Sequence, residues 1–183
     1  LTAMLKILLI KMSSMGDLVH NLPVVTDIRA HYPDALVDWV AEEAYVAIPS
    51  LHPAVHRVIP IAWRRWRRHL GQRQTWTEMA DFRRQLKATD YDFVLDSQGL
   101  WKSAIAGNLA SGTLVGGDSR SIKEPLASVF YKRRIPISWS SHVVDRCRAV
   151  AAGALGYAAD TPPDYGISAP PLEAEWLPAT SYG

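Results

Sequence analysis

The sequence predicts an α/β protein with a doubly wound parallel sheet, and three observations favour this class. Short apolar runs of strand length recur along the chain, at residues 4–10, 35–40, 55–61 and 91–95. Segments with helical spacing separate them, which is the alternation expected of βαβ units. The first run is apolar at nearly every position, as in a strand that is covered on both faces.

Composition places the chain among soluble globular proteins. It has 183 residues, of which 48% are hydrophobic and 21% charged, so it can bury one substantial core. The longest apolar runs are shorter than the roughly 20 residues that a spanning helix needs. A lone Cys147 and a start without a secretory pattern predict a cytoplasmic protein.

The first helix is expected to follow the first strand after one loose turn. Four side chains repeat there at helical spacing: Leu22, Val25, Ile28 and Tyr32. Asn21 is a candidate cap, and Pro23 is tolerated in the first turn of a helix. We therefore expect this helix to begin near Leu22.

Three further helices and a tail complete the predicted organisation. Thr75 and Glu78 form a capping-box pattern that predicts a helix over residues 75–88, and helices are also expected over 100–109 and 143–155. Prolines recur after residue 160, which predicts a linker. We therefore divide the chain into a ligand-binding domain, residues 4–156, and a Pro-rich linker, residues 157–183.

Polar residues directly follow the first strand, in the segment KMSSMGD, residues 11–17. Ligands of open α/β sheets gather at the carboxyl ends of the strands, so this loop is a candidate site. It does not match the glycine patterns of phosphate loops or dinucleotide-binding loops. The alternative is that Asp17 only caps the following turn, and on residue types alone that role is the more frequent one.

A basic segment lies between Glu43 and Glu78, where the sequence has no acidic residue. Six arginines fall in this interval: Arg57, Arg64, Arg65, Arg67, Arg68 and Arg73. If WRRWRRH is helical, Arg64, Arg67 and Arg68 share a face that suits an anion. A solvated face, a nucleic-acid patch and a membrane-surface stripe are the competing interpretations.

The segment KMSSMGDLVHNLPVVTDIRAHYP after the first strand resembles the amino-terminal signature of the bacterial ADP-heptose glycosyltransferases. VDWVAEEAY, LDSQGLWKSA, SIKEPLASVFYKRR and HVVDRCR resemble further segments of that family, so the likeness covers almost all of residues 4–156. It implies the Rossmann-like amino-terminal domain of a GT-B fold, with the acceptor held here and the nucleotide sugar on a second domain.

The implied reaction moves L-glycero-D-manno-heptose from ADP-heptose to Kdo of Kdo2-lipid A, with inversion and without a metal or cofactor. The resemblance implies that Asp17 is the general base, which would remove the proton of a sugar hydroxyl as the bond forms. Nine residues are expected to orient that base or to bind the acceptor: Lys11, Ser14, Arg64, Arg67, Arg68, Arg120, Lys123, His142 and Arg146.

Some of these residues have alternative roles. His142 could equally cap the helix that follows it, and Asp96 could fix a turn rather than face a ligand beside Gln98 and Lys102. The family's donor-binding domain is not matched within 183 residues, so we expect the chain alone to bind acceptor with negligible transferase activity.

The implied partners are Kdo2-lipid A, ADP-heptose and the cytoplasmic face of the inner membrane, where the protein would be peripheral. The nearest alternative is another ADP-heptose transferase of the family, whose acceptor is a heptose. A noncatalytic anion-binding module is the other alternative. The sequence has no RNP-type or helix-turn-helix signature, so we expect no nucleic-acid partner.

Overall fold

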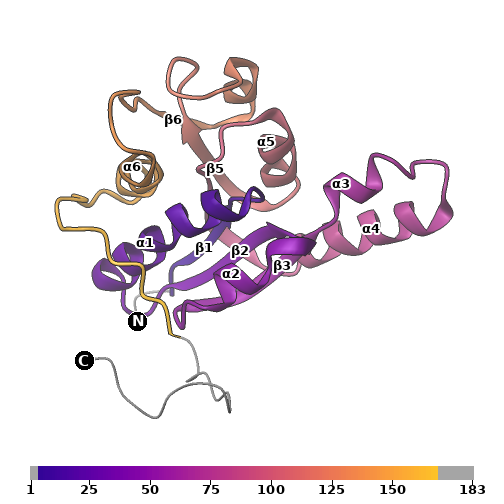
Figure 1. Ribbon diagram of the computed structural model, residues 1–183, viewed down its shortest axis with the longest axis horizontal. Helices are drawn as coiled ribbons and strands as arrows, with labels where there is room; N and C mark the ends of the chain where they lie inside the picture. Colours follow the sequence, from indigo (N-terminus) through magenta and orange to yellow (C-terminus); the bar gives the residue numbers. More distant parts are fainter. Residues whose placement is uncertain (1–3, 169–183) are drawn as a thin grey trace, which may run out of the picture.

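The computed structural model describes residues 4–168, which form one parallel six-stranded sheet (Figure 1). The strands are β1 Lys6–Ile10, β2 Leu36–Glu42, β3 Val55–Ile61, β4 Asp90–Asp96, β5 Ser111–Gly117 and β6 Arg133–Ile135. Their order in the sheet is β3, β2, β1, β4, β5, β6. The winding reverses between β1 and β4, so a crevice is expected where these two strands end.

Helices cover both faces of the sheet, which confirms the predicted class. The longer helices are α1 Met15–His31, α4 Arg73–Lys87, α5 Trp101–Asn108 and α6 Val143–Leu155. The short ones are η1 Glu43–Tyr45, α2 Ala47–Ser50, α3 Trp63–Trp66 and η2 Pro125–Phe130. α1 and α6 pack together on one face, and α4 and α5 lie on the other (Figure 1).

Alternate side chains of β1 enter two separate cores. Ile7 and Leu9 pack with the apolar side chains of α1 and α6, whereas Leu8 and Ile10 pack with those of α4 and α5. All four are at most 2% exposed. The period of two along a strand explains why the run is apolar throughout, and it directs Lys11 toward the α1 and α6 side.

The first helix begins earlier than its apolar spacing predicts. α1 starts at Met15, because Ser14 caps it and the Ser14 N–H donates to the Asp17 carboxylate at 2.8 Å. Asn21 is therefore not a cap but a buried interior residue, whose Oδ1 accepts from Ser97 Oγ at 2.7 Å. Pro23 lies inside the helix, so the prediction of a start near Leu22 was wrong.

The predicted capping box of the next long helix was also wrong. α4 begins at Arg73, and Thr75 is a buried residue whose hydroxyl donates to the His69 carbonyl at 2.8 Å. Glu78 does not reach back to a backbone N–H but accepts from Arg65 and Trp66. Tertiary partners from α3 thus replace the local cap.

Two strands are absent from the expectations above. β5 has the sequence SGTLVGG, whose glycines lower its strand propensity. Gly116 is required there, since a Cβ at this position would lie 2.3 Å from Cε2 of Tyr131. β6 has only three residues, two of them arginine, and so carries no apolar pattern.

The first part of the predicted linker lies against the domain. α6 ends at Gly156, whose φ of 79° is the left-handed conformation common after a helix. The chain then crosses α1 (Figure 1), where Arg148 Nη1 donates to the Thr161 carbonyl at 2.8 Å. The Ser168 N–H donates to the Leu51 carbonyl at 2.9 Å, and residues 169–183 of the predicted linker lie outside the described residues.

Candidate functional site

A cavity of about 100 Å³ opens where β1 and β4 end. Four of the residues that the sequence singled out line it: Lys11, Asp17, Lys123 and Arg146. They come from the loop after β1, the start of α1, the loop after β5 and the face of α6. The fold thus brings the Asp17 carboxylate and three cationic side chains from distant segments to one place, and Asp96 of β4 lies in the same lining.

Asp17 is held as an ionised carboxylate. Its Oδ2 accepts from the Ser14 N–H at 2.8 Å and from Ser14 Oγ at 3.2 Å. Partial burial raises the pKa of Asp17, but the Ser14 hydrogen bonds and the charges of Lys11 and Lys123 outweigh it, so the pKa lies below its ordinary value. Ser14 therefore orients Asp17, and the capping alternative also describes a true contact.

Lys11 lies beneath the cavity and is 5% exposed. Its Nζ donates to the Ser97 carbonyl at 2.9 Å and lies 3.6 Å from Cys147 Sγ. The Lys11 ammonium has few hydrogen-bond partners, and its positive charge acts on the nearby Asp17 carboxylate and lowers the pKa of that group.

Arg146 projects from α6 over the cavity wall. Its guanidinium lies 3.6 Å from the centroid of the Trp139 ring, and Nη2 donates to the Ser121 carbonyl at 2.7 Å. Its Nε is buried without a hydrogen-bond partner among residues 4–168. The stacked ring and the Ser121 contact fix this guanidinium at the wall of the cavity.

Asp96 borders the cavity, but its oxygens are occupied by hydrogen bonds within the domain. It is 1% exposed, and its oxygens accept from the Gln98 and Gly99 N–H groups, from Ser103 Oγ and from Tyr131 OH at 2.7–3.2 Å. Burial raises its pKa against the effect of these donors. The turn-fixing alternative is the one the structure supports.

Replacing Asp96 by Ala should therefore lower the free energy of unfolding by about 2–3 kcal/mol, because buried donors lose their acceptor. The midpoint of urea unfolding, followed by circular dichroism, measures this. Asp96→Asn keeps one acceptor oxygen for the two backbone N–H groups and should cost clearly less. Equal losses for both variants would contradict the role assigned to those two backbone contacts.

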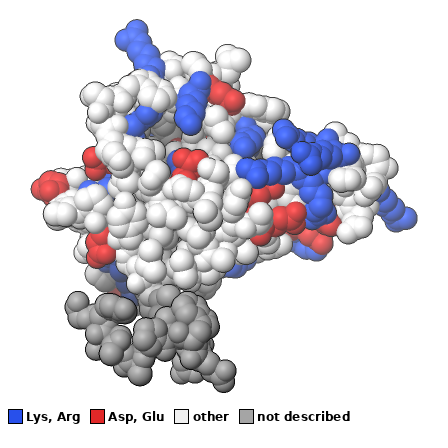
Figure 2. Space-filling view, in the orientation of Figure 1, with Lys and Arg blue, Asp and Glu red and all other residues white. Residues whose placement is uncertain are grey.

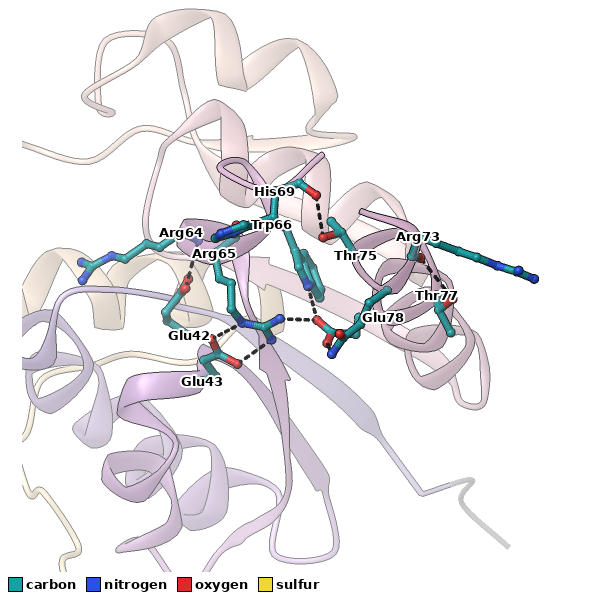
Figure 3. A network of polar contacts seen from close by, with 11 residues as sticks. Glu42, Glu43, Arg64, Arg65, Trp66, His69, Arg73, Thr75, Thr77 and Glu78 are labelled. Atoms are coloured by element: carbon teal, nitrogen blue, oxygen red, sulfur yellow. Dashed lines mark hydrogen bonds and ion pairs between the residues drawn. The ribbon is translucent and has the colours of Figure 1, made fainter. Parts of the chain in front are cut away.

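The basic segment forms an arm beside the cavity. Arg65 is held by Glu43 and Glu78, with N–O distances of 3.0 and 2.7 Å (Figure 3). Arg64 Nη1 donates to Tyr45 OH at 3.1 Å. Figure 2 shows the Lys and Arg side chains gathered over this side of the molecule. Within the described part of the chain, Arg64, Arg67 and Arg68 do not line the cavity.

Lys102 connects the arm to the cavity. Its Nζ donates to Ser13 Oγ at 3.3 Å, and Glu42, Arg64 and Arg67 lie close enough to act on its charge. Burial and the two arginines lower the pKa of Lys102, while Glu42 opposes them. Lys102 thus lies between the arginines of the arm and Ser13 of the cavity lining.

Six predicted residues stand outside the cavity lining: Ser14, Arg64, Arg67, Arg68, Arg120 and His142. His142 is the N-cap of α6, and its Nδ1 accepts from the Val144 N–H at 3.3 Å, which supports the capping alternative. Arg120 is exposed, and its carbonyl accepts from the Trp139 indole N–H. Arg120 therefore supports the ring that carries Arg146.

Sequence reasoning missed several residues of the site. One set has a readable signal, since three α6 side chains line the cavity at helical spacing from the predicted Arg146: Val143, Cys147 and Val150. Ser121 and Trp139 have no such signal, because a long loop brings them to Arg146. Gln98, noted from its position, binds the loop after β1 through the Met12 N–H at 2.6 Å.

Metal-ligand clusters and membrane-spanning helices are both absent from the described part of the chain. Between residues 4 and 168, three or more His, Cys, Asp or Glu side chains never gather closely enough to hold a metal ion. In the same part of the chain, none of the helices has the length and apolar character to span a membrane.

The fold and the site together define an α/β ligand-binding domain, with one ionised carboxylate among cations at the carboxyl edge of its sheet. The comparisons give the particular family. The chain belongs to glycosyltransferase family 9 (heptosyltransferase), whose family model matches residues 79–180. The resemblance stated above is thereby confirmed.

Known relatives agree with this assignment. Lipopolysaccharide heptosyltransferase 1 of Pseudomonas aeruginosa is 46% identical over 89% of this chain and 46% of its own length. The protein of that name from Escherichia coli K12 is 45% identical over 90% of this chain and 52% of its own. The chain thus spans about half the length of the curated relatives that it matches.

Solved structures show the same fold. E. coli heptosyltransferase WaaC with ADP has a TM-score of 0.86 and 45% identity, covering 89% of this chain and 52% of its own. E. coli ADP-heptose heptosyltransferase II has a TM-score of 0.63 at 21% identity, covering 94% of this chain and 47% of its own, a likeness of fold alone.

Proposed function

We propose that the protein transfers L-glycero-D-manno-heptose from ADP-heptose to a Kdo sugar of Kdo2-lipid A, and that this chain holds the acceptor. The observation that carries the proposal is the Asp17 carboxylate, placed in one cavity with Lys11, Lys123 and Arg146. Kdo has a carboxylate beside its hydroxyl groups, so such an acceptor needs a base and cations together. The cavity offers both.

In the proposed reaction Asp17 accepts the proton of the acceptor hydroxyl as its oxygen bonds to the anomeric carbon of heptose. The bond from that carbon to the ADP oxygen breaks, and ADP leaves with the electron pair. Attack from the face opposite ADP inverts the anomeric centre. We propose that cationic side chains, without a metal ion, balance the charge of the acceptor while Asp17 works.

The family alternative is a transferase whose acceptor is a heptose. Identity of 45% to E. coli WaaC, against 21% to E. coli heptosyltransferase II, supports the Kdo acceptor. The noncatalytic anion-binding module has no comparable support, since the chain belongs to a transferase family. We further propose that the protein works peripherally at the cytoplasmic face of the inner membrane, where a lipid acceptor is met.

The test is calorimetric titration of this chain with two soluble core fragments, one ending in Kdo and one ending in heptose. We expect the Kdo-ending fragment to bind about tenfold more tightly or better, because only its terminal sugar has a carboxylate for the cations of the cavity. Equal affinities, or tighter binding of the heptose fragment, would overturn the assignment of the acceptor.

The Asp17 carboxyl should titrate below the ordinary aspartate value of 3.8. A lowered pKa keeps the base ionised at every pH above that value, and its base function is lost only as the pH falls through the lowered pKa. Carboxyl NMR of the chain measures the midpoint. Lys11→Met should raise it, since a neighbouring positive charge is removed, and an unchanged midpoint would show that Lys11 has no such effect.

A further inference from the structure

The segment between α3 and α4 forms an exposed tip at the end of the arm. Residues 67–74 are all exposed, and Figure 1 shows this part of the chain extending beyond the sheet. The tip is nevertheless ordered by its own hydrogen bonds. Thr75 Oγ1 donates to the His69 carbonyl at 2.8 Å, and the Gln72 N–H donates to the same oxygen at 3.0 Å.

The base of the arm is fixed to the body of the domain. Trp66 is 5% exposed, packs edge-on against Phe82, and donates its indole N–H to Glu78 at 2.7 Å (Figure 3). Arg65 bridges Glu43 and Glu78. These contacts occupy the acidic residues nearest to the arm, so they hold the tip at a set position.

The tip combines two large apolar side chains with unpaired cations. Leu70 is 49% and Trp76 58% exposed, and the Trp76 indole N–H donates to the Leu70 carbonyl at 2.8 Å. The polar edge of the indole is thereby satisfied while its ring stays exposed. Arg68 and Arg73 flank these two, without a side-chain partner among residues 4–168.

We propose that this tip, defined by Arg68, Leu70, Arg73 and Trp76, docks on the surface of an anionic lipid bilayer. An exposed indole beside an aliphatic side chain suits the boundary between headgroups and acyl chains. The sequence between residues 43 and 78 has no acidic residue, so nothing within the tip opposes negative headgroups. A partner that binds only by charge would leave the Leu70 and Trp76 side chains exposed to water.

The inference deepens the proposed function, since a transferase with a lipid acceptor has to meet that acceptor at a membrane. It places the membrane contact on the arm and leaves the cavity to the sugar. A second exposed apolar site lies on η2, where Leu126 and Val129 are 79% and 65% exposed. The inference predicts that the tip, and not η2, contacts the membrane. Leu126 and Val129 serve as the matched control.

The experiment is co-sedimentation of the whole chain with vesicles of phosphatidylcholine, with and without phosphatidylglycerol. We expect binding only to the anionic vesicles. Leu70→Ser/Trp76→Ser should weaken it about tenfold or more. Arg68→Gln/Arg73→Gln should weaken it about 25-fold, since each arginine contributes about fivefold. Two control variants should bind as the unchanged chain does. They are Leu126→Ser/Val129→Ser on η2 and Arg83→Gln/Arg84→Gln, which lies on α4 outside the tip.

Three results would overturn the inference. They are failure of the unchanged chain to bind anionic vesicles, loss of binding in the η2 variant but not in the tip variants, and dependence on the arginines alone. The last result would mark the tip as a general polyanion surface, which a short oligonucleotide competitor would confirm. Vesicle binding needs no sugar, so its failure leaves the fragment titration, and hence the proposed function, separately testable.

Discussion

Replacing Asp17 by Asn is expected to slow heptose transfer by about 10²- to 10⁴-fold, equivalent to about 3–5 kcal/mol in the barrier. The amide keeps the size of the side chain but cannot accept the proton of the acceptor hydroxyl. Acceptor binding should be unchanged or tighter, because a negative charge is removed from a site for anions. A loss confined to the rate identifies a base rather than a binding residue.

Transfer is measured after joining this chain to the part of the E. coli relative that it does not cover, since the chain spans about half of that protein. The unsubstituted fusion is the reference, and Asp81→Asn, an exposed carboxylate on α4, is the matched control. If Asp17→Asn transfers heptose at the reference rate, Asp17 is not the base. If it fails to bind acceptor, its role is structural.

Replacing Asp27 by Ala is expected to lower the free energy of unfolding by about 3–5 kcal/mol. Asp27 on α1 accepts two hydrogen bonds from Arg148 on α6, at 2.7 and 3.0 Å, and the two side chains are 8% and 2% exposed. The change leaves the buried guanidinium without its hydrogen-bonded counter-charge, and the Asp145 carboxylate, 3.9 Å from Nη1 and half exposed, replaces it only in part. Urea unfolding monitored by circular dichroism measures the loss.

The control removes both charges together. Asp27→Leu/Arg148→Met should recover most of the lost stability, because buried apolar side chains of similar volume replace a buried pair at little cost. Removing the exposed partner of Arg84 by Asp81→Ala should cost less than about 1 kcal/mol. A double variant as unstable as Asp27→Ala would show that the pair stabilises the packing of α1 and α6 beyond cancelling its own charges.

The sheet could be predicted where its strands carry their own signal. β1, β2 and β4 carry apolar runs, which burial on both faces of a parallel sheet requires. β3 is an edge strand with only part of this pattern. β5 could not be predicted in this way, because the Tyr131 ring packed against Gly116 leaves no room for a side chain there. β6 is an edge strand of three residues that depends on β5 for its position.

Helix starts were misjudged where polar contacts decide them. The apolar spacing indicates which face of α1 is buried but not that Ser14 and Asp17 already close its first turn. The start of α4 likewise depends on Thr75 reaching His69, a contact within a turn that has no sequence pattern. Local propensity is a weak guide at such ends, and contacts from neighbouring segments override it.

The site was only partly readable for a related reason. The loop after β1 could be identified, because topology alone directs it to the carboxyl edge of the sheet. His142 and Asp96 have titratable side chains, yet both accept backbone hydrogen bonds instead. His142 caps α6, and Asp96 fixes the buried turn after β4. Trp139 lies in a loop whose path no pattern in the sequence specifies, although it holds Arg146 in place.

The most direct test of the central claim, that this cavity holds a sugar acid next to Asp17, is calorimetric titration of the Kdo-ending fragment into the Arg146→Gln chain. We expect affinity to fall by about 2 kcal/mol, or about 30-fold in Kd, because a fixed guanidinium is lost from the wall of the cavity. Arg83→Gln, an exposed arginine on α4, should leave Kd unchanged. Equal affinity in the Arg146→Gln chain and the unchanged chain would contradict the placement of the acceptor in this cavity.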